Sequence, residues 1–245
     1  MSDEAAKLKL RREQMKKKYL EFGIDIFEKH ELLEIFLYYC MPRKDTNVIA
    51  HKLMNRFGTL SGVLDAPYDL IVETGVSENT AFMFKFITEF MGVYRNDKLQ
   101  NGSRIVNRDI LPQRFINLYL GKNIEMAYLI LMDLNLKELY SGIVSQGSII
   151  NTELNIPKIC ELAIHHSAKY AIIAHNHPGG SSLPSQADIM ATINLYQTLQ
   201  HLKVTLIDHF VVAGDDCVSF YDAGLMFKSK EEFVLSSFYN SPLLS

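Results

Sequence analysis

The chain has 245 residues, a length that suits one large domain or two small ones. Hydrophobic residues make up 48% of it and charged residues 22%, a composition that excludes disordered, collagen-like and coiled-coil proteins. The 25 Lys and Arg residues against 28 Asp and Glu give a net charge of -3, which excludes a protein that wraps nucleic acid along its whole length. Three widely separated cysteines predict neither a disulfide framework nor a CxxC zinc knuckle.

The start of the chain carries no sign of export. The first twenty residues are rich in Lys and Arg and lack the apolar segment of a signal peptide. The longest apolar runs, such as 126–132, are far shorter than the roughly 20 residues that span a bilayer. We therefore expect a soluble cytoplasmic protein without a membrane partner, and nothing in the sequence indicates an oligomeric state.

Residues 1–97 predict a helical domain. A basic segment opens it between Lys7 and Lys18. Apolar residues at helical spacing predict helices at 31–37, 48–57 and 80–94, and Gly58 is a natural stop for the second of them. The alternation that is typical of strands is missing. We predict a linker at 98–104, where Asn, Gly and Ser follow one another.

Residues 105–228 predict an α/β domain, followed by a C-terminal tail at 229–245. Short apolar runs at 126–132, 170–174 and 206–213 are typical of buried strands, although Asp208 and His209 interrupt the third. Helical stretches lie between these runs, at 157–167 and 185–202. Strands that alternate with helices favour an α/β fold.

Two histidines end the second of these strands. His175 and His177 are two residues apart, so both side chains should leave the same face of the strand. Pro178-Gly179-Gly180 then turns the chain, and a helix follows with Ser185 as its N-cap and Asp188 in its first turn. Such a strand end and helix start can bring two histidines and one carboxylate onto one metal ion. Three N/O ligands leave a fourth position open, as in catalytic zinc sites.

Each part of this pattern also has a simpler explanation. Ser185 and Asp188 form a common capping pair, and the helix dipole favours a carboxylate in a first turn. His175 and His177 can be polar residues at the end of a strand. The four positions together favour a metal site with His175, His177 and Asp188 as ligands.

The spacing His-x-His, seven residues, Ser, two residues, Asp resembles the signature of the MPN+/JAMM metallohydrolases. It is met here by His175, His177, Ser185 and Asp188 without a gap. The resemblance implies Zn²⁺ as the cofactor and a three-layer α-β-α MPN/JAMM domain, related in fold to cytidine deaminases. It also implies a protein or peptide as the substrate.

The chain is more similar still to the bacterial RadC family, and this resemblance covers most of its length. The C-terminal landmarks of the family are Leu131-Met132-Asp133, Gly147-Ser148, His175 to Gly180, Asp208-His209-Phe210 and Ser219-Phe220. RadC proteins also have an N-terminal helix-hairpin-helix region, and this chain is similar to it at Glu31-Leu32-Leu33 and Arg56-Phe57-Gly58. The resemblance therefore implies a helix-hairpin-helix-like N-terminal domain. RadC proteins are often labelled DNA-repair proteins.

The chain departs from the RadC pattern at two positions. Gly179 stands where the family usually has Ser; it is not a ligand, so we expect an effect on the turn and none on the metal. The Gly-x-Gly hairpin expected in the N-terminal domain is Gly75-Val76-Ser77. The second glycine of that hairpin lets backbone N–H groups approach a phosphate, so Ser77 weakens the expectation that this domain binds DNA.

The resemblance implies a catalytic glutamate directly before an apolar strand. Glu125 fills this position, whereas Glu138 follows the strand and fits less well; the alternative for Glu125 is a solvated residue at a strand start. With zinc bound, Glu125 would be the general base for water, and the Ser185 hydroxyl would donate to the developing oxyanion. The resulting reaction is hydrolysis of a peptide or isopeptide bond.

Three neighbouring residues have weaker predicted roles. Asn176 lies between the two histidines and should point to the opposite face of the strand as a loop organiser. Asp208 and His209 can hold the other ring nitrogen of a ligand. They can equally be an ordinary buried pair.

Two other functions stay open. A DNA-associated protein of the RadC type, acting in repair or recombination, needs a basic face, but the first 100 residues carry 15 Lys and Arg against 15 Asp and Glu. Only the segment 7–18 offers such a face, and charge runs of this kind are most often solvated helix faces. The third function is an interaction module that keeps the fold without catalysis, although the intact signature argues against it.

Overall fold

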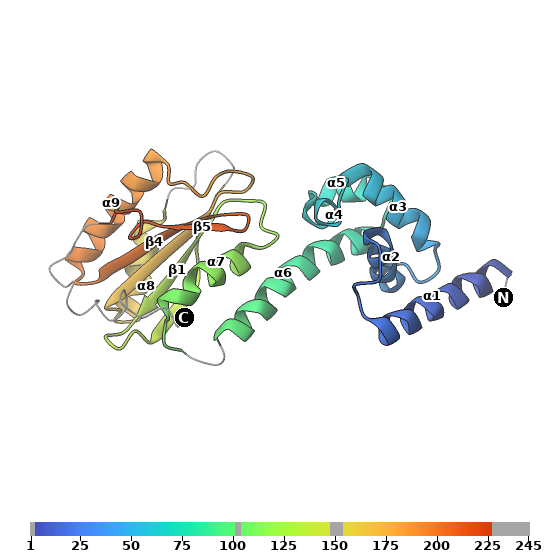
Figure 1. The fold of residues 1–245 in the computed structure, drawn as a ribbon. Coiled ribbons are helices and arrows are strands. Elements are labelled where there is room, and N and C mark those ends of the chain that lie inside the picture. Colours follow the sequence, from blue (N-terminus) through green and yellow to red (C-terminus); the bar gives the residue numbers. More distant parts are fainter. Residues whose placement is uncertain (1–2, 101–103, 148–153, 227–245) are drawn as a thin grey trace. The chain divides into compact units, whose positions relative to one another are not determined.

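The computed structural model describes residues 3–100, 104–147 and 154–226 of the chain (Figure 1). Contacts divide the chain into two compact units, 1–90 and 91–245, which we describe separately. The first is helical, and the second holds a mixed sheet between helices. A helical region followed by an α/β domain was predicted, and this fold class is confirmed. In the part of the chain that the structure describes, no helix is long and apolar enough to cross a membrane.

The first unit is built from short helices around one apolar core. They are α1 (Asp3–Phe22), α2 (Lys29–Cys40), α3 (Thr46–Phe57), α4 (Leu60–Asp65), α5 (Tyr68–Val72) and the first part of α6 (Glu78–Gln100). The core contains the fully buried Leu37, Leu53 and Phe84. The helices predicted at 31–37, 48–57 and 80–94 are confirmed, and Gly58 ends α3 with a φ of +80°, in the region that favours glycine.

Two arginines of the basic segment attach α1 to the rest of this unit. The Arg11 guanidinium donates to both carboxylate oxygens of the buried Glu34, at 2.6 and 2.8 Å. Arg12 donates to the backbone carbonyl oxygens of Met41 and Pro42 at 3.1 and 2.5 Å. These two cations therefore bind α1 to its neighbours. The charge run suggested a solvated helix face, and Arg11 and Arg12 do not fit that description.

Ser77 has a local structural role at the start of α6. Its hydroxyl accepts a hydrogen bond from the backbone N–H of Thr80 at 3.2 Å, and the two hydroxyls are 2.9 Å apart. Serine is a preferred N-cap because it satisfies a backbone donor that the helix leaves unpaired. The residue that replaces the second glycine of the expected hairpin thus caps a helix.

The last turns of α6 belong to the second unit. Asn96 donates to the carbonyl oxygen of Arg114, at 3.0 Å, on α7 (Leu111–Tyr119). Gly92 permits this close packing, since a Cβ there would lie 2.1 Å from the carbonyl oxygen of Asn117. The contacts therefore divide the chain at 90/91, before the predicted domain end at 97.

The predicted linker 98–104 begins inside a helix, because α6 continues to Gln100. Residues 101–103 of this linker lie outside the described residues, as do 227–228 at the end of the predicted second domain and the whole predicted tail 229–245.

The second unit contains a five-stranded sheet in the order β2-β1-β3-β4-β5. Its strands are β1 (Met126–Met132), β2 (Glu138–Gln146), β3 (Tyr170–Asn176), β4 (Thr205–Ala213) and β5 (Asp216–Ser219). Strands β3 and β4 are parallel and the other neighbours are antiparallel. The predicted strands correspond to β1, β3 and β4, and β4 continues through the buried Asp208 and His209 after a register shift between Leu206 and Asp208.

Helices cover both faces of this sheet. Helix α7 packs on one face, where Phe115 meets Phe210 with ring centroids 5.1 Å apart. Helices α8 (Ile156–His165) and α9 (Gln186–His201) pack on the other face through buried residues such as Ile159 and Leu195 (Figure 1). The expected three-layer α-β-α arrangement is confirmed. Because α9 connects the parallel strands β3 and β4, its N-terminus begins near the carboxyl end of β3.

Candidate metal centre

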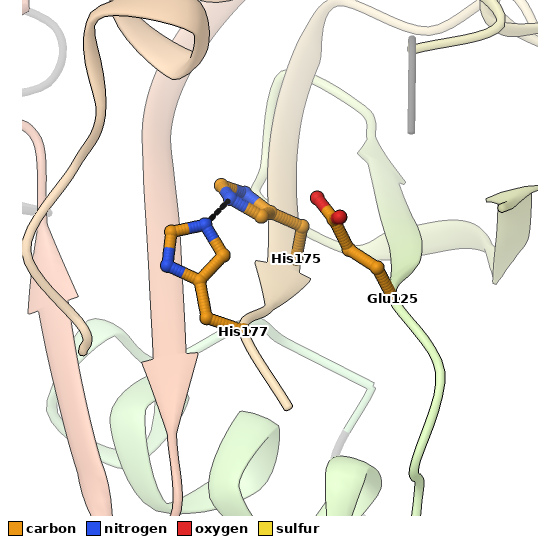
Figure 2. Close-up of side chains that lie close together, drawn as sticks. All are labelled: Glu125, His175 and His177. Atoms are coloured by element: carbon orange, nitrogen blue, oxygen red, sulfur yellow. Dashed lines mark hydrogen bonds between the residues drawn. The ribbon is translucent and has the colours of Figure 1, made fainter. Parts of the chain in front are cut away.

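The candidate centre lies where β3 ends and α9 begins (Figure 2). The β3–β4 ladder extends past the last residue of β3, since the backbone N–H of His177 donates to the carbonyl oxygen of Val212 at 2.8 Å. Pro178 and Gly179 then turn the chain. Gly179 has a φ of +69° and open space around it, so the left-handed backbone of this turn suits glycine better than a residue with a side chain.

The imidazoles of His175 and His177 face each other, as their spacing predicted (Figure 2). Their Nε2 atoms are 2.9 Å apart. The Nδ1 atom of His177 lies 2.7 Å from the carbonyl oxygen of Ser181. A carbonyl oxygen only accepts, so this Nδ1 carries the proton and the neutral ring presents a lone pair at Nε2.

Asp188 faces both histidines from the first turn of α9. Its Oδ1 is 3.0 Å from Nε2 of His175, and its Oδ2 is 3.5 Å from Nε2 of His177. Oδ2 also accepts from the backbone N–H of Ser185 at 2.7 Å, and Ser185 Oγ accepts from the N–H of Asp188 at 3.2 Å. The predicted cap is confirmed, and it directs the same carboxylate toward the histidines. The cap and the proposed ligand role are therefore compatible.

The charge state of Asp188 follows from these contacts. Burial alone would raise the pKa of its carboxyl group. The contacts with His175 and Ser185 outweigh burial and hold this pKa well below its ordinary value. The group is an anion at neutral pH, as a metal ligand must be.

Glu125 approaches the histidines from the start of β1, the neighbour of β3 (Figure 2). One carboxylate oxygen of Glu125 and one ring nitrogen of each of His175 and His177 all lie within 4.8 Å of one another. Glu138, the less suitable glutamate by position, is ion-paired with Arg114 at 2.7 Å.

Asn176 fixes the backbone on both sides of Glu125. Its Oδ1 accepts from the N–H of Met126 at 2.8 Å, and its Nδ2 donates to the carbonyl oxygen of Ile124 at 3.0 Å. The buried amide thus ties the histidine strand to the residues that flank the glutamate. Asn176 organises the start of β1, a role that a single strand in the sequence does not reveal.

A cavity of about 580 Å³ opens over these side chains, within the size range of ligand sites. Its polar end is formed by Glu125, His175, His177, Ser185, Asp188 and His209. Its apolar wall is formed by Ala127, Leu154, Ile156, Ala187, Met190 and Ala191. Asn194 also lines the cavity, and among the residues that the structure describes no Lys or Arg does so.

Two comparisons with known proteins bear on this arrangement. The family model of the RadC-like JAB domain matches residues 109–225. The UPF0758 protein FN0909 of Fusobacterium nucleatum is 31% identical over 223 residues, which cover 88% of this chain and 96% of that protein. The chain belongs to the RadC family. The resemblance predicted from the landmark residues is therefore confirmed.

Two of the RadC landmarks meet behind the centre, on the neighbouring strands β4 and β5. Asp208 accepts from the Ser219 hydroxyl at 2.6 Å and from the N–H of Tyr221 at 3.0 Å. The Phe220 ring stacks on the His209 imidazole, with centroids 4.6 Å apart. The two landmarks therefore form one buried cluster.

His209 contacts the centre, and the Asp208 carboxylate does not. Nδ1 of His175 lies 2.8 Å from Nε2 of His209. Burial holds the pKa of His209 well below its ordinary value, so the ring is neutral at neutral pH. Of the two explanations for this pair, His209 holds the ligand's other ring nitrogen, whereas the Asp208 carboxylate forms an ordinary buried network.

The donor set of the RadC centre fits a zinc ion. Two imidazole nitrogens and one carboxylate converge with mutual distances of 2.9, 3.0 and 3.5 Å. Zinc takes such N and O ligands at about 2.0–2.2 Å, so donors spaced in this way can surround one ion. Lone pairs and a carboxylate that face each other repel unless a proton or cation lies between them. The three side chains therefore form a candidate site for a cation.

Proposed function

We propose that this RadC-family protein is a zinc-dependent hydrolase of peptide or isopeptide bonds. The observation that carries the proposal is the convergence of two imidazoles and one carboxylate beside a second carboxylate at the polar end of the cavity. His175, His177 and Asp188 would hold the ion, and three protein ligands leave a position open for substrate or water.

The side chains around this position supply the rest of the chemistry. Zn²⁺, when bound, would polarise a carbonyl oxygen and lower the pKa of water in the site to about 7. Glu125 takes the proton from the attacking water and returns it to the leaving amine. The Ser185 hydroxyl accepts from Asp188 N–H, and the Ser185 side chain also hydrogen-bonds to the Asp188 carboxylate. When substrate is bound, this hydroxyl would donate its proton to the developing oxyanion instead.

The lining of the cavity does not favour removal of residues from the C-terminal end of a chain. An enzyme that removes C-terminal residues needs a cation for the free carboxylate, and the described lining offers none. Its apolar wall suits a substrate with an apolar side chain beside the scissile bond. We therefore propose that the enzyme is not a carboxypeptidase.

The test combines metal content with cleavage. The full chain is loaded with zinc and dialysed, its metal is measured by mass spectrometry, and a peptide library with internal amide bonds and lysine isopeptides is offered as substrate. We expect stoichiometric zinc in the wild type and in Glu125→Gln, and loss of zinc in His175→Ala. The exposed His201→Ala serves as the control.

Cleavage should be lost in Glu125→Gln and kept in the control Glu161→Gln, whose side chain is exposed on α8. A His175→Ala variant that retains as much zinc as the wild type would contradict the ligand assignment. Full cleavage by Glu125→Gln would remove Glu125 from the mechanism. Zinc binding without cleavage of any library member would favour a module that binds metal without catalysis.

A further inference from the structure

We propose that Thr192 and His209 form a hydrogen-bond relay that fixes the tautomer of His175 and thereby keeps its Nε2 free for the metal. Both are positioning residues, and the inference rests on the proposed zinc site. The relay starts on α9 and crosses β4 to reach the ligand on β3.

The relay begins at the Thr192 hydroxyl, which is buried one turn after Asp188 on α9. Its Oγ1 lies 2.6 Å from the carbonyl oxygen of Asp188. A carbonyl oxygen only accepts, so the single proton of the hydroxyl is donated there. The hydroxyl oxygen can then only accept hydrogen bonds from other groups.

The second step orients the His209 ring. Its Nδ1 lies 2.6 Å from the same Thr192 oxygen. Because that oxygen has no second proton to donate, Nδ1 of His209 carries a proton and donates it. A neutral imidazole has only one N–H, so Nε2 of His209 presents a lone pair. The stacked Phe220 ring holds this orientation.

The third step determines which nitrogen of His175 carries the proton. Nδ1 of His175 lies 2.8 Å from the His209 lone pair and therefore donates to it. In the neutral His175 ring, Nε2 is then the unprotonated nitrogen, and it is the one that faces Asp188 and His177. Only this tautomer can bind a metal through Nε2.

Both ends of the relay lie at proposed metal ligands. It begins at the backbone carbonyl of Asp188, whose side chain faces His175, and it ends at the ring of His175. Without the Thr192 hydroxyl, His209 can carry its proton on Nε2 instead and donate it to Nδ1 of His175. The proton of His175 would then move to Nε2, where it competes with the metal.

The test compares Thr192→Val with Thr198→Val in the full chain. Thr198 is a matched control, because its hydroxyl donates to the Asn194 carbonyl at 2.7 Å on the same helix but is only half-buried. Zinc affinity is measured by chelator competition, and the His175 tautomer is read from ¹⁵N NMR of the metal-free protein at a pH at which the His175 ring is neutral. Thr192→Ser keeps the hydroxyl and should behave as the wild type.

We expect Thr192→Val to lower zinc affinity by about 10- to 100-fold, as other losses of a partner behind a metal ligand do. It should also move His175 from the Nδ1–H toward the Nε2–H tautomer, while Thr198→Val changes neither. Unchanged affinity together with an unchanged tautomer in Thr192→Val would overturn the relay.

A second pair of variants covers the case in which Thr192→Val does not fold. His209→Gln offers an amide oxygen as acceptor to His175, and His209→Leu offers none. We expect the Nδ1–H tautomer to persist only in His209→Gln, and the same tautomer in both variants would contradict the relay. If the wild type binds no zinc but the His175 tautomer still changes in Thr192→Val, the proposed function is rejected and the relay is supported.

Discussion

At the scale of single residues, Asn176 connects the histidine strand β3 to the backbone around Glu125. Its amide pairs with the backbone before and after Glu125. We predict that Asn176→Ala lowers the free energy of unfolding by about 1–3 kcal/mol, because backbone groups of the buried Met126 and the half-buried Ile124 lose their partners. Zinc should remain bound, while Glu125-dependent cleavage falls. Urea denaturation and metal analysis measure the two effects.

Asn176→Asp provides the matched variant. Its carboxylate still accepts from Met126 N–H, but it cannot donate to the carbonyl oxygen of Ile124. We expect its cleavage rate to lie between those of the wild type and Asn176→Ala. Equal cleavage in all three proteins would show that Asn176 does not position Glu125.

Asp208 gives the domain a predictable response to pH. Burial raises the pKa of its carboxyl group from the ordinary 3.8 to about 6, despite hydrogen bonds from Ser219, Tyr221 and His209. Between these two values the folded state keeps a proton that the unfolded state has lost. The contribution of this group to stability is therefore greatest at low pH and falls as pH rises through 6.

Asp208→Asn should remove this dependence. Each pKa unit corresponds to about 1.4 kcal/mol, so the stability of the wild type relative to the variant should fall by about 3 kcal/mol between roughly pH 4 and pH 7. Urea denaturation of both proteins across this range measures the difference. A difference that stays constant with pH would show that the buried carboxyl does not titrate there.

At the scale of elements, the start of α9 combines a helix cap with a ligand position. Ser185→Ala should cost about 1 kcal/mol of stability, the usual effect of losing a serine cap. It should also weaken zinc binding, because the cap restrains Asp188. Asn107→Ala is the control, since Asn107 caps the short helix η1 (Arg108–Ile110) before α7, on the other face of the sheet. Equal zinc affinity in both variants would show that the cap does not hold the ligand.

The elements that sequence patterns could predict are those with long buried runs. Strand β1 matches its apolar run of 126–132 without deviation. Strand β2 was missed, because as an edge strand it buries only Val144 and has no apolar run. Helix α7 was also missed, although the Asn107 cap and Pro112 near its start were available signals.

The part of the candidate site that lies close together in the sequence could be predicted. His175, His177, Ser185 and Asp188 lie within one strand-turn-helix segment, so their proximity follows from the pattern. Thr192 and His209 meet only because β3 and β4 pair in parallel with α9 between them. No spacing in the sequence encodes that contact, and for this reason the relay was not predicted.

At the scale of the whole molecule, DNA binding is the main alternative to hydrolysis. The first 100 residues carry no net charge, and Arg11 and Arg12 are bound within the first unit. We predict weak binding of the full chain to single- and double-stranded DNA in fluorescence anisotropy, with little dependence on salt. Tight binding that falls steeply with salt would contradict this, because it requires several phosphate contacts.

The central claim is a zinc ion held by His175, His177 and Asp188. X-ray absorption at the zinc edge of the zinc-loaded full chain tests it most directly. We predict a first shell of N and O atoms at about 2.0–2.2 Å with the scattering pattern of two imidazoles. A sulfur neighbour at about 2.3 Å, or a shell without imidazole, would place zinc elsewhere and contradict the account.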